Sequence, residues 1–254
     1  MTTELLKTVV EIAVQMIQAG AEIHRVEDSI CRIGAAYGAK RTDIFATTSN
    51  LIVSVEDTGG EVYTQTRRIL STGTDIERLD RLNALARHIT ATCPDAESIR
   101  RQLTVIASRN NRYPAWIYIL ACGICAAAFC VFFGSRAPWE ILVALLVGCL
   151  TGLLIKLTEK FTVNRILARF FCSFAGSLLA IAALRIGLVQ TIDTIIIGNI
   201  MSLIPGVGLT QSIRDLFIGD TFTAILRLIE AVLLALAIAC GYVAAVLLMG
   251  GVAV

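Results

Sequence analysis

The chain has 254 residues, of which 56% are hydrophobic and 17% are charged, and its formal net charge is +2. A soluble domain is about 45–50% apolar, so the excess indicates surface that faces lipid. The nearly balanced charge, without a basic block, excludes nucleic-acid binding on electrostatic grounds.

Charged residues divide the sequence into two parts. Residues 1–112 hold 28 of the 42 charged side chains and both histidines, and the remainder is strongly apolar. We therefore expect a cytoplasmic domain over residues 1–110 and a transmembrane domain over residues 111–254, with the boundary near residues 110–114.

The first part has the periodicities of a small α/β domain. Apolar residues at helical spacing predict two helices that end at Gly20 and Gly38. Three strands are expected at 43–48, 51–56 and 61–66. A hairpin turn is expected at 57–60, because its glycines accept the positive φ that such turns require. Two more helices are expected between residues 76 and 106.

The start of the second helix is unusually polar. Glu22 and Arg25 are spaced i,i+3, and Asp28 and Arg32 are spaced i,i+4, so both pairs are expected to form ion pairs on one helix face. Two interpretations stay open. The face is either simply solvated, or it docks a partner domain or gates a pore through Glu22, Arg25 and Asp28.

Catalytic and cofactor motifs are missing from the sequence. There is no nucleophile elbow, no His-Glu-x-x-His and no P-loop, so we expect no enzyme activity, no cofactor, no metal and no ATP binding of the P-loop type. Cys122 and Cys125 have redox spacing, but they lie within an apolar segment and are expected to be reduced residues at a helix contact.

The second part predicts about five membrane-spanning helices. Four apolar segments are long enough, at 114–133, 139–155, 166–187 and 224–249. A fifth, 192–204, is short and broken by Pro205 and Gly206, so it either spans or re-enters the membrane. The fold class expected is an α/β cytoplasmic domain joined to an α-helical transmembrane bundle with one broken helix.

Positive charges at the ends of the spans predict the orientation. One group precedes the first span and another lies between the second and third spans: Arg100, Arg101, Arg109 and Arg112, then Lys156, Lys160, Arg165 and Arg169. The loop between the first and second spans holds only Arg136, and the segment after the third span holds only Arg185. The N-terminal domain is therefore expected in the cytoplasm of a multi-pass inner-membrane protein.

The broken segment contains the candidate substrate site. A helix that restarts after Pro205 and Gly206 directs its N-terminal amides into a cavity, as in transporters that bind carboxylates. We expect Arg214 to bind the substrate charge, Thr210 and Asn199 to donate or accept hydrogen bonds, and Asp215 or Asp220 to carry a coupling proton.

A second interpretation of this stretch stays open. The Pro205–Gly206 pair can mark an ordinary loop end, with Arg214, Asp215 and Asp220 facing cytoplasmic water. Arg227 and Glu230, which are spaced i,i+3, are expected to form a structural ion pair.

Two motifs resemble the threonine/serine exporter family. One is Gly20-Ala21-Glu22-x-x-Arg25-Val26-Glu27-Asp28, and the other is Pro205-Gly206-x-x-Leu209-Thr210-x-x-Ile213-Arg214-Asp215-x-x-x-Gly219-Asp220. The resemblance implies proton-driven export of threonine and serine or of dicarboxylates such as succinate. Its length resembles the larger subunit of the split form, which works with a second small membrane subunit that supplies the remaining spans.

Two functions of other classes remain as alternatives at this stage. One is a membrane-anchored, hydrolase-like enzyme that uses the cytoplasmic domain, and the other is a scaffold that assembles or regulates another carrier without transporting anything itself.

Overall fold

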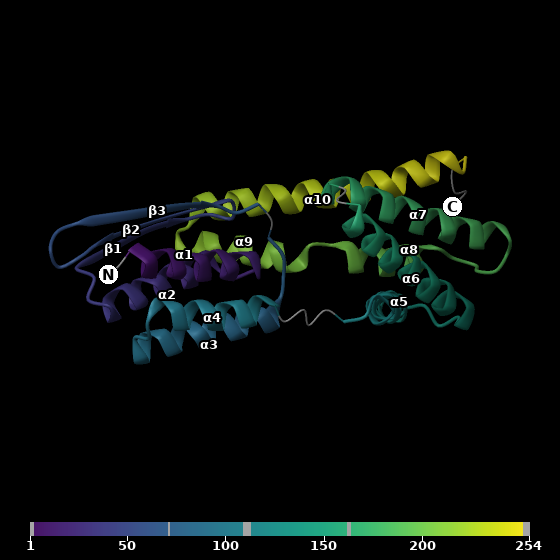
Figure 1. The fold of residues 1–254 in the computed structure, drawn as a ribbon. Coiled ribbons are helices and arrows are strands. Elements are labelled where there is room, and N and C mark those ends of the chain that lie inside the picture. The colour runs from purple at the N-terminus through teal and green to yellow at the C-terminus, as the bar shows by residue number, and fades with distance from the viewer. Residues whose placement is uncertain (1–2, 71, 109–112, 162–163, 251–254) are drawn as a thin grey trace. The chain divides into compact units, whose positions relative to one another are not determined.

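The computed structural model describes residues 3–70, 72–108, 113–161 and 164–250, and it divides into two compact units, residues 1–111 and 112–254 (Figure 1). Arg109 and Arg112, used above for orientation, and part of the predicted boundary lie outside the described residues. Each unit is described by itself below.

The N-terminal unit consists of four helices and one small sheet. The helices are α1 (Thr3–Gln18), α2 (Ile23–Ala36), α3 (Ile76–Thr92) and α4 (Ala96–Ser108). The strands β1 (Arg41–Ala46), β2 (Asn50–Glu56) and β3 (Val62–Arg68) form an antiparallel meander in the order β1-β2-β3. The α/β term was too broad, because a single antiparallel sheet with separate helices is an α+β arrangement.

The buried core explains why these elements form. In β2 the residues Leu51, Val53 and Val55 are buried and alternate with half-buried neighbours, so one sheet face packs on α1 and α2. Helices α3 and α4 pack on α1 from another side (Figure 1). The predicted helix ends are confirmed, since Gly20 and Gly38 both have positive φ after α1 and α2.

The membrane unit contains only helices among its described residues. They are α5 (Ala115–Phe132), α6 (Pro138–Lys160), α7 (Arg165–Arg185), α8 (Asp193–Leu203), α9 (Gly206–Ile218) and α10 (Thr221–Leu248). Four of them are long and apolar enough to cross a membrane, and α8 with α9 could make a fifth span bent by 55°. The chain is thus a mostly helical membrane protein with four or five candidate spans.

Glycines allow α5 and α6 to approach closely. A Cβ added to Gly148 would lie 2.6 Å from the carbonyl oxygen of Cys122, and one added to Gly123 would lie 2.8 Å from that of Leu145. Gly148 and Gly152 form a Gly-x-x-x-Gly pattern, which brings helices together in membranes. Cys122 and Cys149 lie at this contact, and all eight cysteines are free thiols.

Candidate functional site

The interruption between α8 and α9 lies where the sequence predicted it. Helix α8 ends at Leu203, and α9 begins at Gly206, with Pro205 in the N-cap position. Proline lacks an amide hydrogen, so it cannot continue the α8 ladder. The helix axes differ by 55° across this break.

Asn199 lies deep within the membrane unit, in the last turns of α8. Its side chain is 2% exposed, and its Oδ1 accepts a 2.8 Å hydrogen bond from the Thr151 hydroxyl of α6. On the other side it packs against Gly176 of α7, where an added Cβ would lie 2.5 Å from Nδ2. Asn199 therefore fixes α8 between α6 and α7, and the buried pair satisfies polar groups that lipid could not.

The stripe formed by Gln211 and Asp215 on α9 faces α10. Arg227 of α10 lies 3.1 Å from Asp215 Oδ2 and donates a 3.1 Å hydrogen bond to Gln211 Oε1. Both charged side chains are buried, at 10% and 5% exposure for Arg227 and Asp215. The idea that Asp215 faces water is therefore wrong.

The predicted Arg227–Glu230 pair is also wrong. Arg227 pairs with Asp215, whereas Glu230 lies 3.4 Å from Arg165 of α7. Residues three apart on a helix can pair, but a fully buried carboxylate on a neighbouring helix is the stronger partner because less water screens it.

The remaining predicted residues of this stretch lie on the exposed side of α9 or at its end. Thr210 and Arg214 are exposed, and the Thr210 hydroxyl donates to the carbonyl of Gly206. Asp220 caps α10 by accepting a 3.3 Å hydrogen bond from the amide of Thr223. Asn199 and Asp215 are thus buried in helix contacts, while Thr210 and Arg214 are not.

Arg169 of α7 is a candidate site residue that was not predicted from the sequence. Its Nη1 is buried and has no hydrogen-bond partner among the described residues. An unsatisfied buried donor costs about 1–3 kcal/mol, and more when it is charged. In the sequence Arg169 has the position of a flanking charge, but its place within an apolar helix of 21 residues was the signal that could have found it.

A cavity of about 120 Å³ lies beside Arg169, between α6 and α7. Its walls also include Ile155, Thr158, Glu159, Arg165 and Ala168. The acidic groups nearby already have partners, because Glu159 lies 2.8 Å from Lys156 and Glu230 lies 3.4 Å from Arg165. The arrangement can therefore accept a small anion at Arg169.

One apolar cluster lies between the cavity and the end of α8. Leu203, the last residue of α8, is buried in a cluster with Cys172 and Ile238, and Ile155 packs against this cluster. Since Ile155 also lines the Arg169 cavity, the end of α8 is connected to the cavity through one side chain.

The other charged residue buried in this unit has a structural explanation. Glu140, at the start of α6, is 6% exposed and accepts hydrogen bonds from the Ser135 hydroxyl and from the amide and hydroxyl of Thr191, at 2.7, 3.3 and 2.9 Å. It connects the segment before α6 with the segment before α8.

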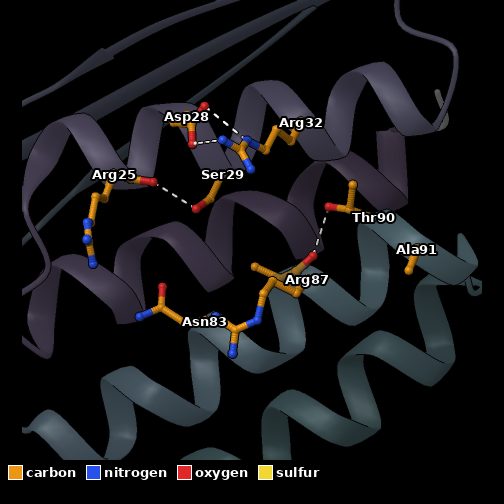
Figure 2. A pocket seen from close by; sticks show the side chains of 9 residues that line it. Arg25, Asp28, Ser29, Arg32, Asn83, Arg87, Thr90 and Ala91 are labelled. Atoms are coloured by element: carbon orange, nitrogen blue, oxygen red, sulfur yellow. Dashed lines mark hydrogen bonds and ion pairs between the residues drawn. The ribbon is translucent and has the colours of Figure 1, made fainter.

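The polar start of α2 lines another cavity, which lies in the N-terminal unit. The predicted ion pairs are confirmed, at 3.5 Å for Arg25–Glu22 and 2.9 Å for Arg32–Asp28. Arg25 and Asp28 line a cavity of about 450 Å³ between α2 and α3, whereas Glu22 is not in its lining (Figure 2). Partial burial, and then the carboxylate of Asp28, raise the pKa of the nearby Cys31 thiol, so this cysteine is not an activated nucleophile.

Comparison with known proteins gives a family match over nearly the whole chain. Residues 7–249 match the ThrE family model, described as "Putative threonine/serine exporter". "Probable succinate transporter subunit YjjP" of Klebsiella aerogenes is 27% identical, covering 95% of this chain and 92% of that protein. The YjjP protein of Escherichia coli is 26% identical and covers 98% of both chains.

A third relative is longer than this chain. "Probable threonine/serine exporter" of Mycobacterium tuberculosis is 24% identical over 94% of this chain but only 45% of its own length. No solved structure matches the chain.

Proposed function

The chain belongs to the threonine/serine exporter family, and from this premise we propose that it is one subunit of a secondary-active exporter of small carboxylate metabolites. The family consists of membrane exporters, so the hypothesis of a membrane-anchored hydrolase-like enzyme is set aside. The names of the relatives offer two substrate classes, which are dicarboxylates such as succinate and the amino acids threonine and serine.

The observation that carries the proposal is the buried Nη1 of Arg169 beside its cavity. Arg169 is partly buried as a residue, but its Nη1 is shielded from water, and an unpaired buried donor costs about 1–3 kcal/mol unless a ligand compensates it. A carboxylate fits best, because it can accept two parallel hydrogen bonds from one guanidinium. The cavity of about 120 Å³ suits a metabolite of a few carbon atoms.

The other cavity residues suggest how the two substrate classes would differ. For a dicarboxylate, the second carboxylate would lie near Arg165. For threonine or serine, the ammonium group would instead need Glu159. A change at Glu159 should therefore affect amino-acid export more than succinate export.

The broken helix would couple substrate binding to a conformational change. We assign Asn199 to the fixed part of α8, Pro205 and Gly206 to the hinge, and Asp215 to the proton site, since its burial against Arg227 makes its charge sensitive to helix movement. Thr210 and Arg214 on the exposed face of α9 are kept as a second candidate site for the substrate charge. Asp220 caps α10 and is kept as the alternative coupling site. Glu22, Arg25 and Asp28 are kept as candidates for docking a partner domain or gating a pore.

Orientation and assembly complete the proposal. Lys156, Lys160, Arg165 and Arg169 at one end of α6 and α7 favour the cytoplasm for that end and for the N-terminal unit. The cavity would then load substrate from the cytoplasm, as export requires. A second small membrane subunit is proposed because two relatives are named as subunits and the mycobacterial exporter is about twice as long.

The test is export by cells that carry a variant in place of the natural chain, preloaded with labelled succinate or threonine. Arg169→Gln should lower the efflux rate at least tenfold, Arg169→Lys should restore part of it, and Lys160→Gln at the same end should leave it unchanged. The amount of protein in the membrane is measured for each variant. If Arg169→Gln exports normally while Arg214→Gln does not, the substrate site lies on α9 instead.

A further inference from the structure

The cavity between α2 and α3 is built from two polar stripes. From α2 come Arg25, Asp28, Ser29 and Arg32, and from α3 come Asn83, Ala86, Arg87, Thr90 and Ala91 (Figure 2). Both sets repeat at three- and four-residue spacing, so each occupies a single helix face. Apolar residues of both helices belong to the buried core, and beside them the polar stripes border an open hollow of about 450 Å³.

Small side chains create this hollow. Ala86 is buried and Ser29 is short, so neither fills the space between the helices. The hydroxyls already have local acceptors, because Ser29 donates to the Arg25 carbonyl at 2.7 Å and Thr90 donates to the Ala86 carbonyl at 2.9 Å. What remains directed toward a ligand are charged and amide donors.

The charge around the cavity is strongly unbalanced. Three guanidinium groups face one carboxylate, that of Asp28, and Arg32 already holds it through both oxygens at 3.1 and 2.9 Å. Arg25 has a looser pair with Glu22 at 3.5 Å. Arg87 makes no ion pair with any residue that the structure describes. Like charges around one hollow repel each other, and an anion would relieve that repulsion.

From this arrangement we infer that the cavity is a binding site for a small organic anion with two or more carboxylates. Arg25 on α2 and Arg87 on α3 each bind one carboxylate, and the Asn83 amide donates to the same ligand. A guanidinium binds a carboxylate through two parallel hydrogen bonds, so the two arginines would together bind a molecule that spans both helices. This site is separate from the Arg169 cavity and stands whether or not that cavity binds substrate.

The ligand would act as a regulator that binds to the N-terminal unit. It would join α2, whose first turns contain the second part of the Gly20–Asp28 motif, to α3. The segment that leads into α3 is held to the end of α1, since the amide of Asp75 donates to the Ala19 carbonyl at 2.9 Å. Occupancy would thus lock the three helices α1, α2 and α3 together.

The test is hydrogen–deuterium exchange of the full chain in lipid nanodiscs with citrate, succinate, inorganic phosphate or neutral succinamide. The Arg169→Gln variant is used throughout, so that no signal from the membrane cavity contributes. Citrate and succinate should slow exchange in α2 and α3, while succinamide should not. Phosphate should protect less, because it offers one anionic group where the proposed ligand offers two or more.

Arg87→Gln should raise the dissociation constant of citrate about tenfold or more. The matched Arg101→Gln, which only loses its pair with Glu97, should leave it unchanged. If Arg87→Gln unfolds, Arg87→Lys and Arg25→Gln replace it and should weaken binding as well. Unchanged affinity in these variants, equal protection by succinamide, or stronger protection by phosphate would overturn the inference.

Discussion

The two units of this protein differ in where some of their charged residues lie. In the N-terminal unit, ion pairs such as Arg101–Glu97 and Arg32–Asp28 lie on helix surfaces, with side chains about half to three-quarters exposed. In the membrane unit, Asp215, Arg227 and Glu140 are almost fully buried. The first unit has many exposed charges, each of small energetic effect, whereas the second combines exposed pairs such as Arg165–Glu230 with a few buried charges of large energetic effect.

This difference shows where function is to be sought. An exposed ion pair is worth about 0–1 kcal/mol because water screens it and side-chain entropy opposes it. A buried charge must be compensated, so each one either has a partner or awaits a ligand. Asp215 and Glu140 have their partners, whereas Nη1 of Arg169 has none among the described residues.

The strongest test of the comparison is the removal of Asp215. Asp215→Asn leaves Arg227 buried without its counter-charge, which should destabilise the membrane unit by about 3–5 kcal/mol. Thermal unfolding in detergent should show a midpoint lower by roughly 10 °C. Combining it with Arg227→Gln should recover part of this loss, and a single variant as stable as the natural chain would break the comparison.

A second test asks whether close packing matters as much as charge in the membrane unit. Gly148→Ala places a Cβ 2.6 Å from the Cys122 carbonyl oxygen, so α5 and α6 must separate. We expect a loss of about 1–3 kcal/mol in the same unfolding experiment.

Gly208→Ala is the matched control, because no atom lies within 4 Å of its added Cβ. That change should be neutral or slightly stabilising, since alanine is the better helix former. Equal unfolding midpoints for the two alanine variants would show that the α5–α6 contact is looser than described.

The smallest effect is expected at the surface of the N-terminal unit. Glu97→Gln removes the pair with Arg101, in which both side chains are more than 70% exposed. The unfolding midpoint should move by no more than a degree or two, because such pairs contribute at most about 0.5 kcal/mol. A loss as large as that of Asp215→Asn would mean that exposure does not set the weight of a charge here.

Much of the local structure followed from the sequence. Gly20, Gly38 and the turn at residues 57–60 ended or reversed elements as predicted, because positive φ is a local requirement of the backbone. The break at Pro205 is also local, because proline has no amide hydrogen for the helix ladder. The i,i+3 and i,i+4 pairs at the start of α2 also form, since helix geometry alone brings those residues together.

Contacts between different helices could not be predicted from the sequence. The pattern offered Glu230 as the partner of Arg227, but the packing of α9 on α10 gave it Asp215. Arg169 and Arg165 looked alike as flanking charges, yet only Arg169 turns a nitrogen away from water without an acceptor.

The sequence by itself determined the family, the positions of most helices and the interrupted segment, because these depend on periodicity, composition and backbone constraints within a few residues. Tertiary structure alone decided which charges are buried, which of them have partners and where the cavities lie. Burial depends on residues far apart in the chain, and the energy of a charge depends on burial.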